Sequence, residues 1–293
     1  NTNEMQFFSY FLCLSFVPIT SMVASYVARV TYDQRIYLAN ILFLILLGFP
    51  DFTNVISQNG YMDIPVTCFT IIAIGLFVAG WSMTKKDDIY AMKLIVLSIA
   101  CAAGAAAIKQ SGMMIAILSF PAIIYWSYTF KKSIIKILII LILIHICVYG
   151  FWYFTAILNI LDGISSSEFS IVQSQFSHLE TIWDRVFRAY SIWPHYFYMV
   201  AIALFSLSIP YYRWFGLICL PGIAIWSLFF SFDYRNFQPV LPFVAISFSG
   251  IIYFLLSKLY LLPIINFKFN FSYLQFFNKV ITSLIIFTTT VLF

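Results

Sequence analysis

Apolar runs long enough to cross a membrane, separated by short polar connections, dominate this chain. A helix needs about 20 apolar residues to cross the hydrocarbon core of a bilayer. Segmentation at that length gives ten runs: 6–28, 36–50, 64–83, 90–108, 112–130, 135–158, 193–210, 214–231, 239–257 and 279–293. We therefore predict an all-α fold, a polytopic transmembrane bundle of about ten helices, with 1–293 as a single transmembrane domain.

The composition excludes a soluble globular protein. The chain is 62% hydrophobic and only 9% charged, whereas soluble domains carry about 25% charged residues. Its five cysteines lie inside apolar runs without metal-ligand spacing, so neither a disulfide framework nor a zinc site is expected. The formal net charge of +5 follows from the distribution of lysine and arginine between the two sides of the membrane, so no nucleic-acid partner is expected.

The charged residues separate by sign if consecutive runs alternate in direction. One side then collects mostly bases, with three acids: Arg29, Arg35, Lys85, Lys86, Lys93, Lys131, Lys132, Lys136, Arg213, Lys258, Lys268 and Lys279, beside Asp33, Asp87 and Asp88. The other side collects most of the acids, with four bases: Glu4, Asp51, Asp63, Asp162, Glu168, Glu180, Asp184 and Asp233, beside Lys109, Arg185, Arg188 and Arg235. By the positive-inside rule the first side is cytoplasmic. We expect an integral protein of the bacterial inner membrane, or alternatively of the endoplasmic reticulum membrane, with its functional site on the extracytoplasmic side.

Three polar connections face the extracytoplasmic side in this topology: 51–63, 159–192 and 232–238. The second is the largest, and the stretch IWDRVFRAYSIW within it predicts a short amphipathic helix on the surface. A tight hairpin is predicted at Lys109-Gln110-Ser111-Gly112, because the ammonium of Lys109 would otherwise lie within one long apolar helix over 90–130. On the cytoplasmic side, 258–279 carries lysines among aromatic residues and predicts an interfacial or re-entrant connection.

Asp63 is the candidate catalytic residue. It lies in GYMDIP, where an outer connection becomes a helix, and Pro65 suits the first turn of that helix. The acid either caps the helix, where the helix dipole favours a negative charge, or acts on a polar substrate as a base or electrostatic partner. Asp51 is a second candidate for substrate binding, or alternatively the end of the preceding helix.

The bases of the extracytoplasmic side are candidate phosphate ligands. Arg235 lies in DYRNFQPVLP, just outside a helix that begins at proline, where a guanidinium is well placed to hold a phosphate at the membrane surface. Lys109 has a similar position, although either side chain could also reach to the interface for solvation alone. Arg185 and Arg188 either share this role or form a solvated helix face.

The order of these features resembles the GT-C superfamily of polytopic glycosyltransferases. The segments GYMDIP, AAAIKQSGMMIAILSFP and DYRNFQPVLPFVAI carry the likeness, with the long outer loop between the second and the third. The nearest branch contains the protein mannosyltransferase-like and aminoarabinose-transferase-like enzymes. The resemblance implies that a first helix and a first outer loop with an essential Asp precede this sequence, and we expect both of its ends to be truncated. Segment 51–63 then corresponds to the second outer loop and 159–192 to the large loop after the seventh helix.

The resemblance implies a glycosyltransferase that takes a sugar from a polyprenyl-phosphate-type lipid donor. The acceptor is a lipid, a glycan or a protein on the extracytoplasmic side. In this reading Asp63 orients the acceptor or a metal, while Lys109 and Arg235 hold the lipid phosphate. A divalent metal remains open as a cofactor, and membrane lipids are further partners.

Two other functions remain open from the sequence. An O-antigen polymerase or ligase also has many helices, a large outer loop and outer arginines, but depends less on carboxylates. A transporter or flippase would place charges in the middle of helices and often shows internal repeats, neither of which is visible here.

Overall fold

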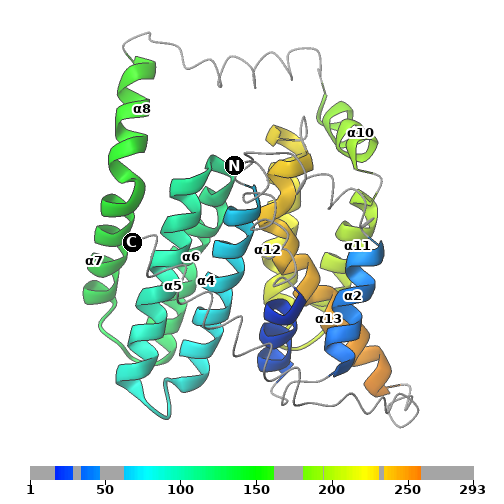
Figure 1. Cartoon of the computed structure of the whole chain (residues 1–293), viewed down its shortest axis with the longest axis horizontal. Helices are drawn as coiled ribbons and strands as arrows, with labels where there is room; N and C mark the ends of the chain where they lie inside the picture. The colour runs from blue at the N-terminus through cyan, green and yellow to red at the C-terminus, as the bar shows by residue number, and fades with distance from the viewer. Residues whose placement is uncertain are drawn as a thin grey trace, which may run out of the picture.

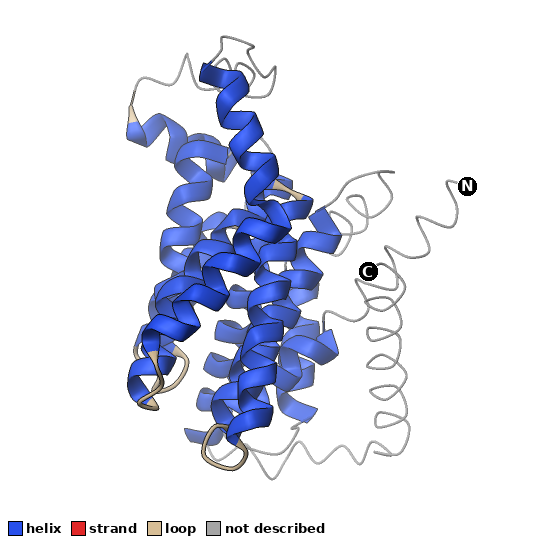
Figure 2. Ribbon diagram, turned by 90° about the vertical axis from the view of Figure 1, so that its left-hand side faces the viewer, coloured by secondary structure: helices blue, strands red, loops and turns tan. Residues whose placement is uncertain are grey.

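A computed structural model describes residues 17–28, 34–46, 63–161, 181–193, 195–230 and 234–258 of the 293-residue chain. No strand occurs within these ranges, and the fold is an all-α helical bundle, as predicted (Figures 1 and 2). The first helix in this part of the chain is Val17–Ala28. The elements after it are α2 (Gln34–Leu46), α4 (Asp63–Met83), α5 (Asp88–Ile108), η1 (Gln110–Gly112), α6 (Met113–Thr129), α7 (Ile134–His145), η2 (Ile146–Gly150), α8 (Phe151–Leu161), α10 (Ile182–Ile192), α11 (Tyr196–Leu207), α12 (Arg213–Ile225), η3 (Trp226–Phe230), η4 (Tyr234–Val240) and α13 (Leu241–Lys258).

Among the described residues, four helices are long and apolar enough to cross a membrane: Pro65–Met83, Asp88–Ile108, Ile134–Asn159 and Asn236–Ser257. Four more are apolar but shorter: Val17–Ala28, Met113–Thr129, Tyr196–Leu207 and Arg213–Leu228. Together with the composition, these lengths identify a membrane protein. The exposed surface agrees, because α7 buries one stripe, Ile137, Leu141 and His145, and leaves apolar side chains such as Ile135 outside.

The close packing of α4 against α5 follows from small residues. The segment Cys101–Ala106 of α5 is buried along its whole length, and it contains four alanines and Gly104. Side chains of this size let two helix backbones approach each other, which is the usual source of packing energy between helices in lipid. Across the same contact, the hydroxyl of Ser98 donates to the carbonyl oxygen of Ala73 at 2.7 Å.

Polar side chains also join the helices on the other side of the bundle. The amide Nδ2 of Asn40 in α2 donates to the hydroxyl of Ser21 at 2.6 Å, and its Oδ1 accepts from the hydroxyl of Ser249 in α13 at 2.8 Å. The phenol of Tyr212, before α12, donates to the carbonyl oxygen of Ala24 at 2.6 Å. These bonds fix Val17–Ala28, α2, α12 and α13 relative to one another around a shared apolar core.

The two ends of the bundle differ in charge. One end, called the lysine end below, is formed by the turns 84–87, 130–133 and 208–212 and by the last turn of α13 (Figure 1). Its basic residues include Lys85, Lys86, Lys131, Lys132, Arg213 and Lys258, with Lys93 and Lys136 in the first two turns of α5 and α7. The opposite end, called the η4 end, contains the start of α4, the turn between α5 and α6, α10 and η4.

Most predicted helices are confirmed to within a few residues, and the differences have local causes. The run 193–210 forms a helix only over Tyr196–Leu207, since its two ends carry Pro194 and Pro210. The run 239–257 becomes α13 from Leu241, and the 3₁₀ helix η4 precedes it. Several predicted segments lie in whole or in part outside the described residues: 6–16, 47–62, 162–180, 231–233, the connection 259–279 and the run 279–293.

Candidate functional site

Three segments that the sequence analysis singled out meet at the η4 end. Helix α4 begins at Asp63, η1 directly follows Lys109, and η4 contains Arg235. The 3₁₀ helix η4 packs against both α4 and η1, and η1 also contacts α4. Segments around positions 63, 109 and 235 are thus brought together by the fold, although more than forty residues separate each from the next along the chain.

The hairpin at Lys109 is confirmed, and hydrogen bonds hold it in a tight form. Lys109 ends α5 in an extended conformation (φ −158°, ψ 149°), and its N–H donates to the carbonyl oxygen of Ala105 at 3.3 Å. Its own carbonyl oxygen accepts from the N–H of Gly112 at 2.9 Å. The side chain of Lys109 is half-buried at this turn.

Gly112 is required by the close approach of two backbones. A Cβ atom at this position would lie 2.1 Å from the carbonyl oxygen of Ala105. The absence of a side chain at Gly112 therefore allows α6 to begin directly beside the end of α5, and it sets the position of Lys109.

Ser111 adds a polar group that the sequence analysis did not single out. Its hydroxyl oxygen is enclosed and has no hydrogen-bond partner among the described residues. Buried hydroxyls are normally hydrogen-bonded, so an enclosed hydroxyl in the hairpin beside Lys109 offers a contact for a polar group of a ligand. A serine within an interrupted apolar run is the only sequence signal for it.

The segment that leads into α13 is helical, whereas an irregular connection was expected. Arg235 was predicted to lie in a connection just outside a helix, but Tyr234–Val240 forms a 3₁₀ helix that contains Pro239. Phe237, Gln238 and Val240 of this helix are buried. The main chain at Arg235 is therefore held by a packed element, because the side chains that follow it are inserted into the core.

Aromatic rings connect η4 to α10 and α11. The ring of Phe237 lies 5.1 Å from that of Trp193 and 5.2 Å from that of Trp226, in edge-on arrangements. Tyr196 lies 6.2 Å from Trp226. These four residues, called the aromatic cluster below, pack together and hold η4 in place at the η4 end.

The amphipathic helix predicted within 159–192 is confirmed as α10. Thr181 and Asp184 form a capping box, in which the Thr181 hydroxyl accepts from the Asp184 N–H at 3.1 Å and the Asp184 carboxylate accepts from the Thr181 N–H at 2.9 Å. The Asp184 carboxylate also accepts from the Thr181 hydroxyl at 2.7 Å, and these bonds lower the pKa of Asp184. The sequence signal is the capping residue three positions before an acid.

The arginines of α10 do not form a solvated face. Arg185 and Arg188 are half-buried, and Nη1 of Arg185 donates to the carbonyl oxygen of Leu228 in η3 at 3.0 Å. The exposed side chains of α10 are instead largely apolar: Ile182, Trp183, Phe187 and Tyr190. Exposed tryptophan and tyrosine side chains, such as Trp183 and Tyr190, are typical of a membrane–water interface.

The described part of the chain does not include the side chains of the remaining candidates, and it contains no assembled set of metal ligands. Asp51 lies outside the described residues, and so do the side chains of Asp63 and Arg235. The described residues contain no group of three or more His, Cys, Asp or Glu side chains arranged to hold a metal ion. Thus the structure places the segments of Asp63, Lys109 and Arg235 at one end, with Arg185 and Arg188 at that same end.

Comparisons with models of protein families, with curated proteins and with solved structures found no match to this chain.

Proposed function

We propose that this protein is a membrane glycosyltransferase of the GT-C type that uses a sugar linked to a polyprenyl phosphate. The observation that carries the proposal is the packing of η4 against α4 and against η1. An acid, a lysine and an arginine that are far apart in the sequence are thereby assigned to one end of the bundle. Glycosyl transfer is favoured by a carboxylate that orients the acceptor hydroxyl and by cations near the departing phosphate, and these residue types meet both needs.

Each residue has a proposed role in this reaction. Asp63 accepts a hydrogen bond from the acceptor hydroxyl and orients it, and any divalent metal would also be held there. Lys109 and Arg235 bind the phosphate of the donor, with the enclosed Ser111 hydroxyl as an additional polar contact. The polyprenyl tail lies in the bilayer against the exposed apolar faces of the bundle.

We propose that the η4 end faces the extracytoplasmic side of a multi-pass protein of the bacterial inner membrane. The basic residues at the lysine end support this orientation through the positive-inside rule. A membrane-impermeant maleimide should label Ser191→Cys, which is exposed on α10, from outside intact cells, and should not label Lys86→Cys. Labelling of Lys86→Cys alone would reverse the orientation.

One observation favours a second candidate, an O-antigen polymerase or ligase. Arg185 and Arg188 are half-buried and do not form a solvated helix face, so their guanidinium groups belong to the η4 end. Arginine-dominated recognition of a lipid diphosphate suits that class. A transporter is less well supported, since the Asp, Glu, Lys and Arg residues of the described spanning helices lie within six residues of a helix end.

A donor titration with Arg235 variants tests the proposed function. A phosphate that contacts a bidentate guanidinium predicts apparent donor affinity in the order Arg, Lys, Ala, because Arg235→Lys retains the charge but loses the second hydrogen bond. Arg213→Ala, at the lysine end, is the matched control and should leave donor affinity unchanged. Equal donor affinity for wild type, Arg235→Lys and Arg235→Ala would remove Arg235 from the site.

A further inference from the structure

We propose that the lysine end carries a binding site for the phosphodiester headgroup of an anionic phospholipid, formed by Lys85, Lys86 and Lys131. Each of the two turns contains a pair of consecutive lysines, Lys85-Lys86 and Lys131-Lys132. The inference is independent of glycosyl transfer and of the side of the membrane that each end of the bundle faces. It concerns the end of the bundle opposite to the candidate active site.

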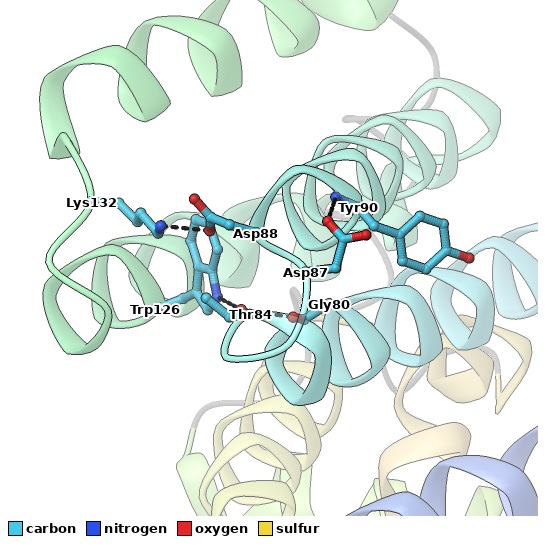
Figure 3. A network of polar contacts seen from close by, with 7 residues as sticks. All are labelled: Gly80, Thr84, Asp87, Asp88, Tyr90, Trp126 and Lys132. Carbon is cyan, nitrogen blue, oxygen red and sulfur yellow. Dashed lines mark hydrogen bonds and ion pairs between the residues drawn. The ribbon is translucent and has the colours of Figure 1, made fainter.

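Two contacts hold the turns 84–87 and 130–133 side by side (Figure 3). The Nζ atom of Lys132 lies 2.5 Å from Oδ1 of Asp88, which joins the second turn to the start of α5. The indole N–H of Trp126 donates to the hydroxyl of Thr84 at 2.9 Å, and that hydroxyl donates to the carbonyl oxygen of Gly80 at 2.8 Å. Both Trp126 and Thr84 are buried, so the core of α4, α5 and α6 fixes the distance between the two turns.

The two acids of this region, Asp87 and Asp88, already have partners within the fold. Asp87 caps α5, and its Oδ1 accepts from the N–H of Tyr90 at 3.0 Å, while Asp88 pairs with Lys132. Lys85, Lys86 and Lys131 are exposed and form no ion pair within the described part of the chain. Three ammonium groups therefore remain available to a ligand, although two carboxylates lie in the same short segments.

The backbone at Lys131 provides an independent observation. Lys131 has a φ of 53°, in the left-handed region that glycine adopts most easily. It follows α6 as the C′ residue of a Schellman motif, in which the N–H of Lys132 donates to the carbonyl oxygen of Ser127 at 2.8 Å and that of Lys131 to Tyr128 at 3.3 Å. Glycine is the usual residue at this position. A lysine at a position where glycine would be less strained is the kind of local conflict expected at a functional site.

The surrounding side chains match the headgroup level of a bilayer. Tyr90 and Tyr128 are exposed beside the lysines, and Ile89 is exposed between Asp88 and Tyr90. Trp81 packs edge-on against Phe130, the residue before Lys131, with ring centroids 5.2 Å apart. Tyrosine and tryptophan gather where acyl chains meet headgroups, so a lipid phosphate next to these rings would lie within reach of the lysines. We therefore assign the site to a phospholipid and not to a soluble phosphate ester.

Native mass spectrometry of the purified full chain in detergent micelles tests the proposal. Phosphatidylglycerol and phosphatidylcholine with the same acyl chains are titrated, and the bound lipid is counted. We expect a preference for phosphatidylglycerol, with a loss of about fivefold in its affinity for each lysine removed, as for lysines at an anionic surface. Lys85→Gln/Lys86→Gln should therefore lose about 25-fold, and Arg213→Gln, exposed at the same end, should lose nothing.

Lys131→Gly separates binding from a structural role, because the two predict opposite results. Glycine relieves the left-handed backbone, so the melting temperature should rise, while the affinity for phosphatidylglycerol should fall about fivefold. Equal binding of the two lipids by wild type, or unchanged affinity in Lys131→Gly, would overturn the proposal. Competition by an equal concentration of glycerol 3-phosphate would reassign the site to a soluble phosphate ester.

The lipid titration contains no sugar donor, so a negative result would not count against the proposed transferase. A failure of the donor titration would likewise not count against the lipid site. Labelling of Lys86→Cys from outside the cell together with selective binding of phosphatidylglycerol would overturn the orientation and retain the lipid site. Normal orientation with no selectivity between the lipids would show that the lysines act only as determinants of topology.

Discussion

Replacing Gly112 by alanine tests the hairpin that positions Lys109. An ideal Cβ atom at Gly112 would lie 2.1 Å from the carbonyl oxygen and 2.3 Å from the carbonyl carbon of Ala105, and 2.9 Å from the nitrogen of Ala106. Ordinary contacts of a Cβ atom begin at 3.4 Å, so the two backbones must separate by more than 1 Å. Both alanines are fully buried in the contact between α4 and α5, and movement on that side would disturb the core.

The expected cost is that of inserting an atom into a packed interior, about 1–3 kcal/mol of unfolding free energy. Gly75→Ala in α4 is the matched control. Its Cβ would lie 3.4 Å from Cγ2 of Val23, an ordinary contact, and alanine in the interior of a helix is favoured over glycine by about 0.5–1 kcal/mol. The same substitution should therefore destabilise the protein at one position and leave it equal or more stable at the other.

The assay is unfolding of the full chain in detergent, followed by tryptophan fluorescence, with both variants measured beside wild type. We expect Gly112→Ala to unfold more easily than wild type, and Gly75→Ala to unfold at or above the wild-type midpoint. If the two variants are equally stable, the close approach of η1 to α5 is wrong, and so is the position of Lys109 that depends on it.

Three further predictions concern other contacts. Asn40→Leu removes the bonds between α2 and its neighbours and should cost about 0.6–2 kcal/mol in unfolding titrations, whereas no cost would show that these bonds do not hold the helices together. Thr84→Val takes the acceptor from the buried indole of Trp126 and should cost about 1–3 kcal/mol, while Thr84→Ser should retain wild-type stability. The lowered pKa of Asp184 means that its cap on α10 is present above the ordinary carboxyl pKa of 3.8 and is lost as the pH falls through the folded value. Hydrogen exchange in α10, corrected for intrinsic rates, should therefore increase below that pH in wild type and not in Asp184→Asn, and identical profiles would contradict the cap.

The positions of the helices could be predicted from the sequence because membrane thickness sets their length. The run 90–108 became α5 (Asp88–Ile108), and 112–130 became α6 (Met113–Thr129). The break between them was predictable because Lys109 is costly inside lipid. The sequence did not predict the π-helical turn Ile146–Gly150, since the run 135–158 contains no proline, and His145 and Gly150 at the two ends of the turn do not by themselves indicate a π helix.

The candidate site was predicted only in part, because tertiary packing decides which side of an element faces the bundle. The pattern of α10 predicted an amphipathic helix, but left open whether Arg185 faces water or the η4 end. Contact with Leu228, 43 residues later, determines the answer. Likewise, the aromatic cluster joins residues from 193 to 237, and a chain rich in aromatic residues throughout gave no signal for that grouping.

Photoaffinity labelling with a donor analogue tests the central claim most directly. The analogue is a sugar polyprenyl phosphate with a diazirine on the isoprene unit next to the phosphate, and the full chain is labelled in vesicles and mapped by mass spectrometry. The proposed site predicts adducts at the start of α4, in the hairpin 109–112 and in η4, which unlabelled donor suppresses and Arg235→Ala weakens. Competed adducts confined to the turns 84–87 and 130–133, or the same pattern from a polyprenyl alcohol without phosphate, would contradict a lipid-phosphate site at the η4 end.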